Sequence, residues 1–252
     1  MMDWLLFGIF IFLMLTGVPL AVAMGLAGVA VVAVADLGMM SLPTNVYTGI
    51  AKYPLMAIPV FVIAGLIFEK AGVAATIVRF ASALVGQRRG SLAIVAILVA
   101  MILGGISGSG PADSAAVGAV MLPSMLKAGY PRSFTAGVIA AAGSTDILIP
   151  PSIAFVIYSL LVPQASVPAL FAAGMIPGIL SGLTLILVAW WLSVKNNFEA
   201  EPTEPRPPFW QSLKEAGWGL LAPVIILGGM RSGFFTPTEA AVVAVFYGLI
   251  VG

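Results

Sequence analysis

The sequence predicts an all-α polytopic membrane protein, and three observations lead to this fold class. First, 61% of the 252 residues are hydrophobic and only 8% are charged, whereas soluble domains carry about 25% charged residues. Second, the hydrophobic residues form repeated runs that approach the roughly 20 residues a membrane helix needs. Third, glycine and proline interrupt several of these runs, which favours helices that break inside the bilayer.

The composition also excludes several classes of function. The chain has no cysteine and no histidine, which excludes disulfides, thiolate chemistry, zinc or haem ligation by these residues, and Ser-His or Cys-His catalytic pairs. Lysine and arginine total 11 against 10 acidic residues, so no charge excess favours a nucleic-acid partner. The apolar N-terminus lacks a basic region and a cleavage pattern, so we interpret it as a retained membrane segment.

The N-terminal part is expected to contain one long helix, a turn and two further helices. Residues 4–34 form an apolar run interrupted at 17–19, which predicts a kinked or broken helix. A turn is expected around 43–54, followed by an apolar helix over 58–68. The basic, amphipathic stretch 69–90 is expected to lie at the cytoplasmic interface of the membrane.

The next two apolar pieces, 91–106 and 111–126, are each slightly short for a span. Basic turns precede the first piece and follow the second, where Lys127 and Arg132 lie, and both turns favour the cytoplasm. A re-entrant hairpin over 91–126 that turns at 107–110 satisfies both facts. Two short spans joined by an outside loop are the alternative.

The C-terminal part is expected to begin with a second broken helix. Its halves are 133–142 and 151–162, with the break at 143–150. Residues 178–194 then span back to a hydrophilic linker over 195–208, whose prolines favour an extended chain. An interfacial helix anchored by Trp210 and Trp218 is expected over 210–216, followed by apolar segments at 220–230 and 238–251. Because the sequence stops inside a hydrophobic run, we interpret it as truncated.

The two interruptions, at 106–110 and 143–151, predict a binding site. Irregular backbone survives in the hydrocarbon only where it is buried in protein or faces a water-filled cavity. At the first, Pro111 suits the start of a new helix capped by Gly110, and a helix N-terminus favours an anion such as a carboxylate. At the second, Pro150 and Pro151 lack N–H groups, so nearby carbonyls lose their helical partners.

Free carbonyls together with serine and threonine hydroxyls predict an oxygen-rich pocket that suits sodium better than a transition metal. A discontinuous helix of this kind is typical of secondary transporters. The hydroxyls concerned belong to Ser107, Ser109, Ser144 and Thr145.

Each acidic residue near these interruptions has two interpretations. Asp113 either completes a capping box with Gly110 or is a ligand, and we favour the cap. Asp146 either caps the turn at Pro150 or belongs to the site, because a carboxylate at membrane depth costs about 2.5–3.5 kcal/mol and is a site candidate by default. Glu239 reads as the first-turn acid of the last helix.

An enzyme is not expected. Gly105-Ile106-Ser107-Gly108 matches the GxSG pattern of intramembrane serine proteases, but the histidine base is absent. Asp113 and Asp146 lack the GxGD context of intramembrane aspartyl proteases. The stretch GGISGSGPA lacks the Gly-Lys-Ser/Thr ending of a phosphate-binding loop.

Four motifs, in this order, resemble the large membrane subunit of the tripartite ATP-independent periplasmic (TRAP) transporters. They are IPVFVIAGLIFEKAGVA (58–74), GGISGSGPADSAAVGAVMLPSMLKAGYP (104–131), ILIPPSIAFVIYS (147–159) and LFAAGMIPGIL (170–180). The resemblance implies a multi-pass protein of the bacterial inner membrane. It also implies sodium-driven import of organic acids such as C4-dicarboxylates, with no cofactor other than the coupling ion.

The same resemblance implies partners and a mechanism. A soluble periplasmic binding protein would deliver the substrate, and a small four-helix membrane subunit would brace the large one. The fold would be of the elevator type, with a re-entrant hairpin and a broken helix in the first half of an inverted repeat, plus the start of the second. The implied sodium ligands are Ser107, Ser109, Asp146, Ile149 and Pro151; the implied substrate-facing residues are Ser107, Gly108, Ser109, Gly110 and Pro111.

Four regions follow from this comparison. They are N-terminal scaffold helices (1–57), a transport region (58–194) with the hairpin (91–126) and the broken helix (133–162), a linker with its interfacial helix (195–219), and the start of the second repeat (220–252).

Two departures from the family pattern matter. The chain covers little more than half of a typical large subunit, so this polypeptide alone is not expected to transport. Asp146 stands where the family often has a small residue.

The alternative functions are a sodium/carboxylate symporter that needs no binding protein and a membrane scaffold that does not transport.

Overall fold

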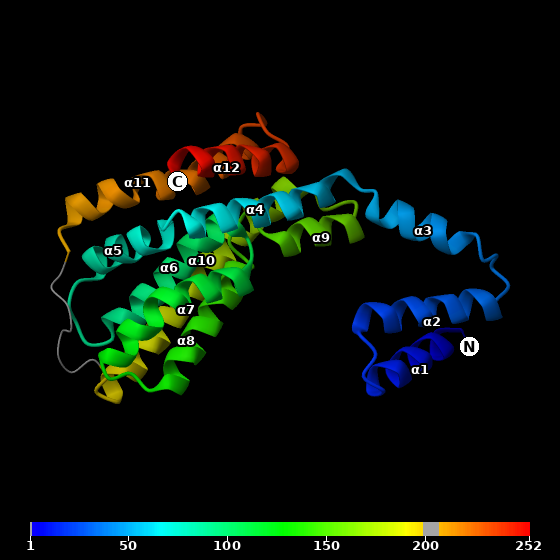
Figure 1. Ribbon diagram of the computed structural model, residues 1–252, viewed down its shortest axis with the longest axis horizontal. Coiled ribbons are helices and arrows are strands. Elements are labelled where there is room, and N and C mark those ends of the chain that lie inside the picture. The colour runs from blue at the N-terminus through cyan, green and yellow to red at the C-terminus, as the bar shows by residue number, and fades with distance from the viewer. Residues whose placement is uncertain (1, 199–206) are drawn as a thin grey trace. The chain divides into compact units, whose positions relative to one another are not determined.

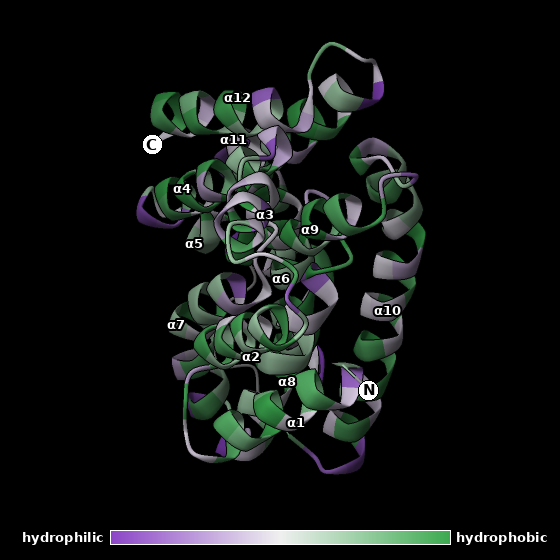
Figure 2. Cartoon of the chain, turned by 90° about the vertical axis from the view of Figure 1, so that its right-hand side faces the viewer, coloured by the Kyte–Doolittle hydropathy of each residue, from purple (hydrophilic) through white to green (hydrophobic). Residues whose placement is uncertain are grey.

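The computed structural model describes residues 2–198 and 207–252, and in these ranges every regular element is a helix (Figure 1). The chain separates into two compact units, Met1–Lys52 and Tyr53–Gly252. Figure 2 shows hydrophobic residues along most of the helical ribbon. Three described helical segments are long and apolar enough to cross a membrane: Tyr53–Lys70, Val167–Lys195 and Phe209–Arg231.

The first unit contains helices α1 (Met2–Leu15), α2 (Leu20–Val34) and α3 (Ser41–Ile50). The predicted interruption at 17–19 is confirmed, but α1 and α2 fold back and pack on each other instead of forming one kinked helix. The turn predicted from residue 43 is wrong for most of its length, because α3 occupies that stretch. Pro43 lies in the first turn of α3, where its missing N–H removes no helical hydrogen bond.

The second unit contains the remaining helices. They are the 3₁₀ helix η1 (Tyr53–Met56), α4 (Ala57–Lys70), α5 (Val73–Val85), α6 (Ser91–Ser107), α7 (Gly110–Lys127), α8 (Arg132–Asp146), α9 (Ile153–Leu161), α10 (Val167–Lys195), α11 (Phe209–Arg231) and α12 (Pro237–Val251). Helix α4 confirms the apolar helix predicted over 58–68, and α5 lies inside the amphipathic stretch 69–90.

Two layers make up this unit. Helix α11 packs along α5 and α12 packs along α4, while α6, α7, α8 and α10 form a bundle beside them (Figure 1). One apolar core lies among α5, α6, α7 and α8, with Ile77 and Ile97 fully buried. A second core joins α4, α9, α10, α11 and α12 around Phe61 and Ile226.

Two predicted helix boundaries are wrong. The interfacial helix at 210–216 and the apolar segment at 220–230 form one continuous helix, α11, which carries Pro223 in its interior. Likewise α10 begins at Val167 instead of residue 178 and continues through Pro177. Proline inside a membrane helix removes one backbone hydrogen bond, and neighbouring helices can compensate for it.

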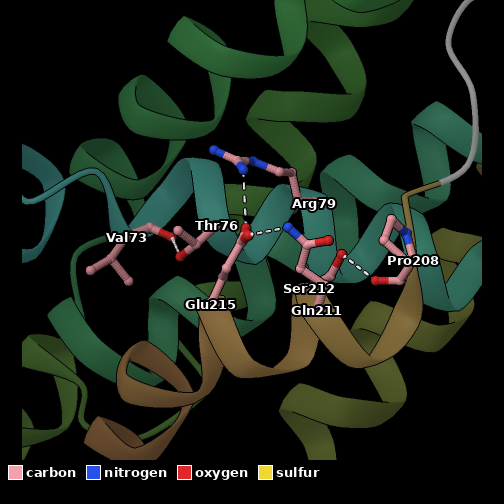
Figure 3. A network of polar contacts seen from close by, with 7 residues as sticks. All are labelled: Val73, Thr76, Arg79, Pro208, Gln211, Ser212 and Glu215. Atoms are coloured by element: carbon pink, nitrogen blue, oxygen red, sulfur yellow. Dashed lines mark hydrogen bonds and ion pairs between the residues drawn. The ribbon is translucent and has the colours of Figure 1, made fainter.

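Helices α5 and α11 contact each other through polar side chains, which Figure 3 shows, and through apolar residues. Arg79 Nη1 lies 3.0 Å from Glu215 Oε2, and Gln211 Nε2 donates to Glu215 Oε1. This ion pair is exposed and contributes little on its own. Most of the attraction comes from the apolar contact, where Gly219 lets α11 approach Val73 closely.

Helix α12 begins with a capping box. The Thr236 hydroxyl oxygen accepts from the Glu239 N–H, and the Glu239 carboxylate accepts from the Thr236 N–H. The predicted role of Glu239 as a first-turn acid is therefore confirmed.

We expect Ile97→Ala to destabilise the protein by about 2 kcal/mol or more, because it leaves a cavity in the core. Ile97 is fully buried, whereas Ile176 is 68% exposed, so Ile176→Ala is the matched control and should be nearly neutral. Thermal unfolding in detergent measures both. Equal effects of the two substitutions would contradict the assignment of the core.

Candidate functional site

The tip of the α6–α7 hairpin consists of Gly108 and Ser109 and confirms the turn predicted at 107–110. Gly108 adopts a left-handed conformation with φ of 65°, and its N–H donates to the Gly104 carbonyl oxygen over 3.1 Å. This conformation ends α6 and reverses the chain without the strain that a Cβ atom would add.

The two arms of the hairpin are tied together by Ser107 and Asp113. The Ser107 hydroxyl lies 2.7 Å from both carboxylate oxygens of Asp113, and both residues are buried. The Ser109 N–H donates to the Ser107 hydroxyl oxygen over 3.1 Å. A serine hydroxyl has one donor and two lone pairs, so Ser107 keeps one lone pair for a further partner.

The predicted capping box of Asp113 with Gly110 is wrong. Ser109 is the N-cap of α7, and Gly110 is already its first helical residue. The Asp113 carboxylate instead accepts from Ser107, six residues earlier in the chain. The N-cap Ser109 makes no side-chain capping hydrogen bond, so the first N–H groups of α7 are left to another acceptor.

A pocket lies on the side of the hairpin tip that faces α4. Its polar lining consists of Ser107, Ser109, Asp113 and the carboxylate of Glu69, and apolar residues of α4, α5, α6 and α7 supply the rest. Its cavity volume is about 40 Å³. The hydroxyls predicted as sodium ligands therefore line a pocket together with two carboxylates.

The second interruption separates α8 from α9 and spans residues 147–152, so the predicted break at 143–150 begins four residues too early. The reason lies in Pro150, whose missing N–H would have bonded the Asp146 carbonyl four residues back. The helix can therefore continue to Asp146. There the Ile149 N–H bonds the Asp146 carbonyl oxygen over 3.1 Å instead, in a tighter turn.

Because residues 143–146 are helical, two hydroxyls expected in the oxygen-rich pocket are already engaged. Ser144 Oγ donates to the Ala141 carbonyl and Thr145 Oγ1 donates to the Ala142 carbonyl, each over 2.7 Å. Each hydroxyl donates within its own helix but keeps its oxygen lone pairs, and neither residue lines the pocket beside α4. Their role as cation ligands stays a prediction.

Ser152 organises the break and was missed from the sequence. Its hydroxyl donates to the Ile147 carbonyl oxygen over 2.6 Å and accepts from the Phe155 N–H. One side chain thus provides a hydrogen-bond partner for a carbonyl just after α8 and for an N–H in the first turn of α9. A serine directly before an apolar helical run is a common N-cap signal, and this signal could have identified it.

Four consecutive carbonyls in the break have no hydrogen-bond donor among the described residues: those of Leu148, Ile149, Pro150 and Pro151. Pro150 and Pro151 are themselves buried. Backbone carbonyls at this depth need a partner, and carbonyl oxygens are ligands that hard cations accept.

The hairpin tip and the break between α8 and α9 are in direct contact. The Ile153 N–H at the start of α9 donates to the Gly108 carbonyl oxygen at the hairpin tip over 3.3 Å. A Cβ atom at Gly108 would collide with the Pro151 carbonyl oxygen. On the other side of the break, a Cβ atom at Gly174 of α10 would lie 2.7 Å from the Leu148 carbonyl oxygen. Glycines on both sides therefore allow the hairpin tip and α10 to pack closely against the break.

Asp146 is the last residue of α8, and its completely buried side chain faces α6. Neither carboxylate oxygen has a hydrogen-bond partner among the described residues, so the side chain does not cap the turn at Pro150. A Cβ atom at Gly104 would lie 2.7 Å from the Asp146 Cβ atom. The glycine on α6 therefore makes room for this side chain.

The structure brings only part of the predicted ligand set together. Ser107 and Ser109 line the pocket beside α4. Pro151 contacts the tip at Gly108, whereas Ile149 packs against Gly178 of α10. No described cluster of three or more acidic residues has the arrangement of a metal centre. The roles of the individual residues stay predictions.

We expect Gly108→Ala to destabilise the chain more than Gly129→Ala. Both glycines have a positive φ, but a Cβ atom at Gly129 meets open space whereas one at Gly108 meets Pro151. The left-handed conformation alone costs roughly 1–2 kcal/mol, and overpacking adds about 1–3 kcal/mol. Melting temperatures of the two variants in detergent measure the difference. Equal melting temperatures of the two variants would show that the hairpin tip does not pack tightly against the break.

Comparison with known proteins identifies the family. Residues 7–252 match the family model described as "Tripartite ATP-independent periplasmic transporter, DctM component". The chain is 41% identical over 249 residues to the C4-dicarboxylate TRAP transporter large permease protein DctM of Vibrio cholerae, covering 98% of this chain and 55% of that protein. It is 40% identical over 249 residues to the isethionate TRAP transporter permease protein DctMQ of Oleidesulfovibrio alaskensis, covering 98% and 39%.

A third relative is the 2,3-diketo-L-gulonate TRAP transporter large permease protein YiaN of Escherichia coli, 41% identical over 236 residues, covering 93% of this chain and 55% of that protein. The chain thus spans about half the length, or less, of these curated relatives. The match to the family model covers nearly all of the chain and agrees with the resemblance seen in its motifs. The chain belongs to the DctM component family of the tripartite ATP-independent periplasmic transporters.

Proposed function

We propose that this chain supplies an ion- and substrate-binding part of a permease that imports an organic acid with sodium across the bacterial inner membrane. A periplasmic binding protein would deliver the acid, and a small membrane subunit would support the permease. Family membership supports this proposal. So do the names of the relatives, which are transporters of C4-dicarboxylates, isethionate and 2,3-diketo-L-gulonate.

The observation that carries the proposal is the run of carbonyls without donors beside the hairpin tip. The carbonyls of residues 148–151 lack donors among the described residues. Those of Pro150 and Pro151 face α6 and the tip, which the Ile153–Gly108 hydrogen bond holds in place, whereas that of Leu148 faces α10. Sodium binds carbonyl and hydroxyl oxygens, and unwound backbone between half-helices is where secondary transporters bind such ions. A cation beside the tip would give the Pro150 and Pro151 carbonyls the partner that the protein does not provide.

Two further groups complete the proposed ion site. Asp146 supplies a buried carboxylate without a partner, and Ser107 has one lone pair left after accepting from Ser109 and donating to Asp113. The charge of the ion and of the Asp146 carboxylate would offset each other in the membrane interior.

The N-terminus of α7 is the proposed site for the substrate carboxylate. It carries the positive end of the helix dipole, and its N-cap Ser109 does not occupy the first N–H groups. Because the tip and the break are hydrogen-bonded to each other, we propose that they move together as part of an elevator-type transport region.

The first test is a thermal unfolding measurement in sodium against the same concentration of potassium. A ligand that binds only the folded state stabilises it by about 2.7 kcal/mol at a hundredfold excess over Kd. We expect sodium to raise the melting temperature and Ser107→Ala to weaken this rise. Ser159→Ala is the control, because the Ser159 hydroxyl bonds a carbonyl of its own helix away from the tip.

An unchanged sodium response in Ser107→Ala would remove Ser107 from the ion site. The absence of any sodium-specific rise in the unmodified protein would instead favour a membrane scaffold that does not transport.

We expect Asp146→Asn to separate ion binding from stability. In potassium the variant should be at least as stable as the parent, because it removes a buried carboxylate that has no partner. In sodium it should lose most of the stabilisation. Melting temperatures in both salts measure the two effects. A full sodium response in Asp146→Asn would place the cation elsewhere.

A further inference from the structure

Basic residues gather at the end of the helix bundle opposite the hairpin tip. Within residues 88–195 the sequence has five basic residues: Arg88, Arg89, Lys127, Arg132 and Lys195. All five are exposed and lie where α6 and α8 begin and where α7 and α10 end. The two acidic residues of the same range, Asp113 and Asp146, lie near the opposite ends of their helices. We call the five residues the basic end.

Contacts between distant segments hold the basic end together. Arg89 Nη1 donates to Asn197 Oδ1 over 2.9 Å, and Gly90 packs against Ser193 and Trp190 of α10. The Tyr130 ring, in the turn after α7, lies 5.6 Å from the Phe198 ring. The loop before α6 and the turn after α7 therefore both contact the C-terminal end of α10.

An apolar wall adjoins these charges. Trp190 and Trp191 are 45% and 54% exposed, and Lys195 Nζ lies 4.8 Å from the centroid of the Trp191 ring. Exposed tryptophans at the end of a membrane helix are typical of the headgroup level. The exposed side chains of Leu187 and Leu183 extend the wall along α10 toward the middle of the helix. Figure 2 shows hydrophobic residues along α10 and hydrophilic residues in the turns at the lower end of the view.

We infer that the basic end, with Trp190 and Trp191, is a binding surface for anionic phospholipid headgroups. Arginine and lysine bind phosphate oxygens with charge-assisted hydrogen bonds, and clusters of such residues beside membrane helices recognise anionic lipids. The tryptophans and the apolar wall of α10 offer contacts to the acyl chains, which a free phosphate ion would not use. The surface therefore fits a lipid better than a soluble anion.

The experiment uses the purified chain in detergent, supplied with phosphatidylglycerol or phosphatidylcholine, and counts retained lipids by native mass spectrometry. We expect a preference for phosphatidylglycerol that falls about fivefold for each basic residue removed, since each contributes about 1 kcal/mol. The test variant is Arg88→Gln/Arg89→Gln/Lys195→Gln. The charge-matched control is Lys52→Gln/Lys70→Gln/Arg231→Gln, which changes exposed basic residues outside the basic end.

Two further measurements separate this inference from misfolding and from simple phosphate binding. Asn197→Ala removes the hydrogen bond to Arg89 but leaves its charge, so it should keep the preference, as should the charge-preserving Arg88→Lys/Arg89→Lys/Lys195→Arg variant. Retention of the preference in the triple glutamine variant would overturn the inference. Displacement of phosphatidylglycerol by millimolar inorganic phosphate would also overturn it, because it would show a soluble-anion site.

Discussion

The structure of this chain depends on the requirement that backbone polar groups be satisfied where no water reaches them. The hydrogen bond between the Ile153 N–H and the Gly108 carbonyl oxygen meets this requirement for two interruptions at once. It gives the first turn of α9 an acceptor and gives the reversed chain at the hairpin tip a donor. In hydrocarbon each unsatisfied group would cost several kcal/mol. This hydrogen bond therefore couples the stability of the tip to that of the break.

Close packing makes this dependence possible. The hairpin and the break could not approach within hydrogen-bond distance if side chains stood between them, and the contact positions on α6, at the hairpin tip and on α10 are glycines. Gly104 receives Asp146, Gly108 faces Pro151, and Gly174 faces Leu148. Small residues at helix contacts are the usual means of close approach in membranes, where the hydrophobic effect does not drive helices together. The same packing leaves little freedom for the tip to move apart from the break.

Local chemistry explains what the sequence alone could predict. The turn at the hairpin tip follows from Gly108 and from Pro111 just after it, and the capping box of α12 follows from Thr236 and Glu239, three residues apart. These signals act within one helical turn. The fold class, too, follows from composition, because only helices or closed barrels satisfy the backbone in lipid.

The features that sequence reasoning missed depend on contacts between distant parts of the fold, or on the position of the carbonyl that loses its hydrogen bond because of a proline. Asp113 bonds Ser107 across the hairpin tip, a pairing that needs the turn geometry and not only the spacing. The break starts after Asp146 because a proline frees the carbonyl four residues before it. Helix α11 continues through Pro223 because packing against α5 and α12 supports it on both sides. Asp146 sits beside Gly104, which lies in another helix and 42 positions away in the sequence (146 − 104).

The distribution of charge supports the proposal of a coupling ion that binds and leaves. Asp113 has a hydroxyl partner, whereas Asp146 has none among the described residues, and no lysine or arginine occurs between residues 133 and 194 that could pair with it. A fixed arginine beside Asp146 would neutralise it permanently and stabilise one state only. A buried carboxylate that lacks a resident partner is neutralised by a proton or by a cation from solution, and we propose the coupling cation for this role. This is what coupling requires, because an ion drives a conformational change only if its binding differs between the two states.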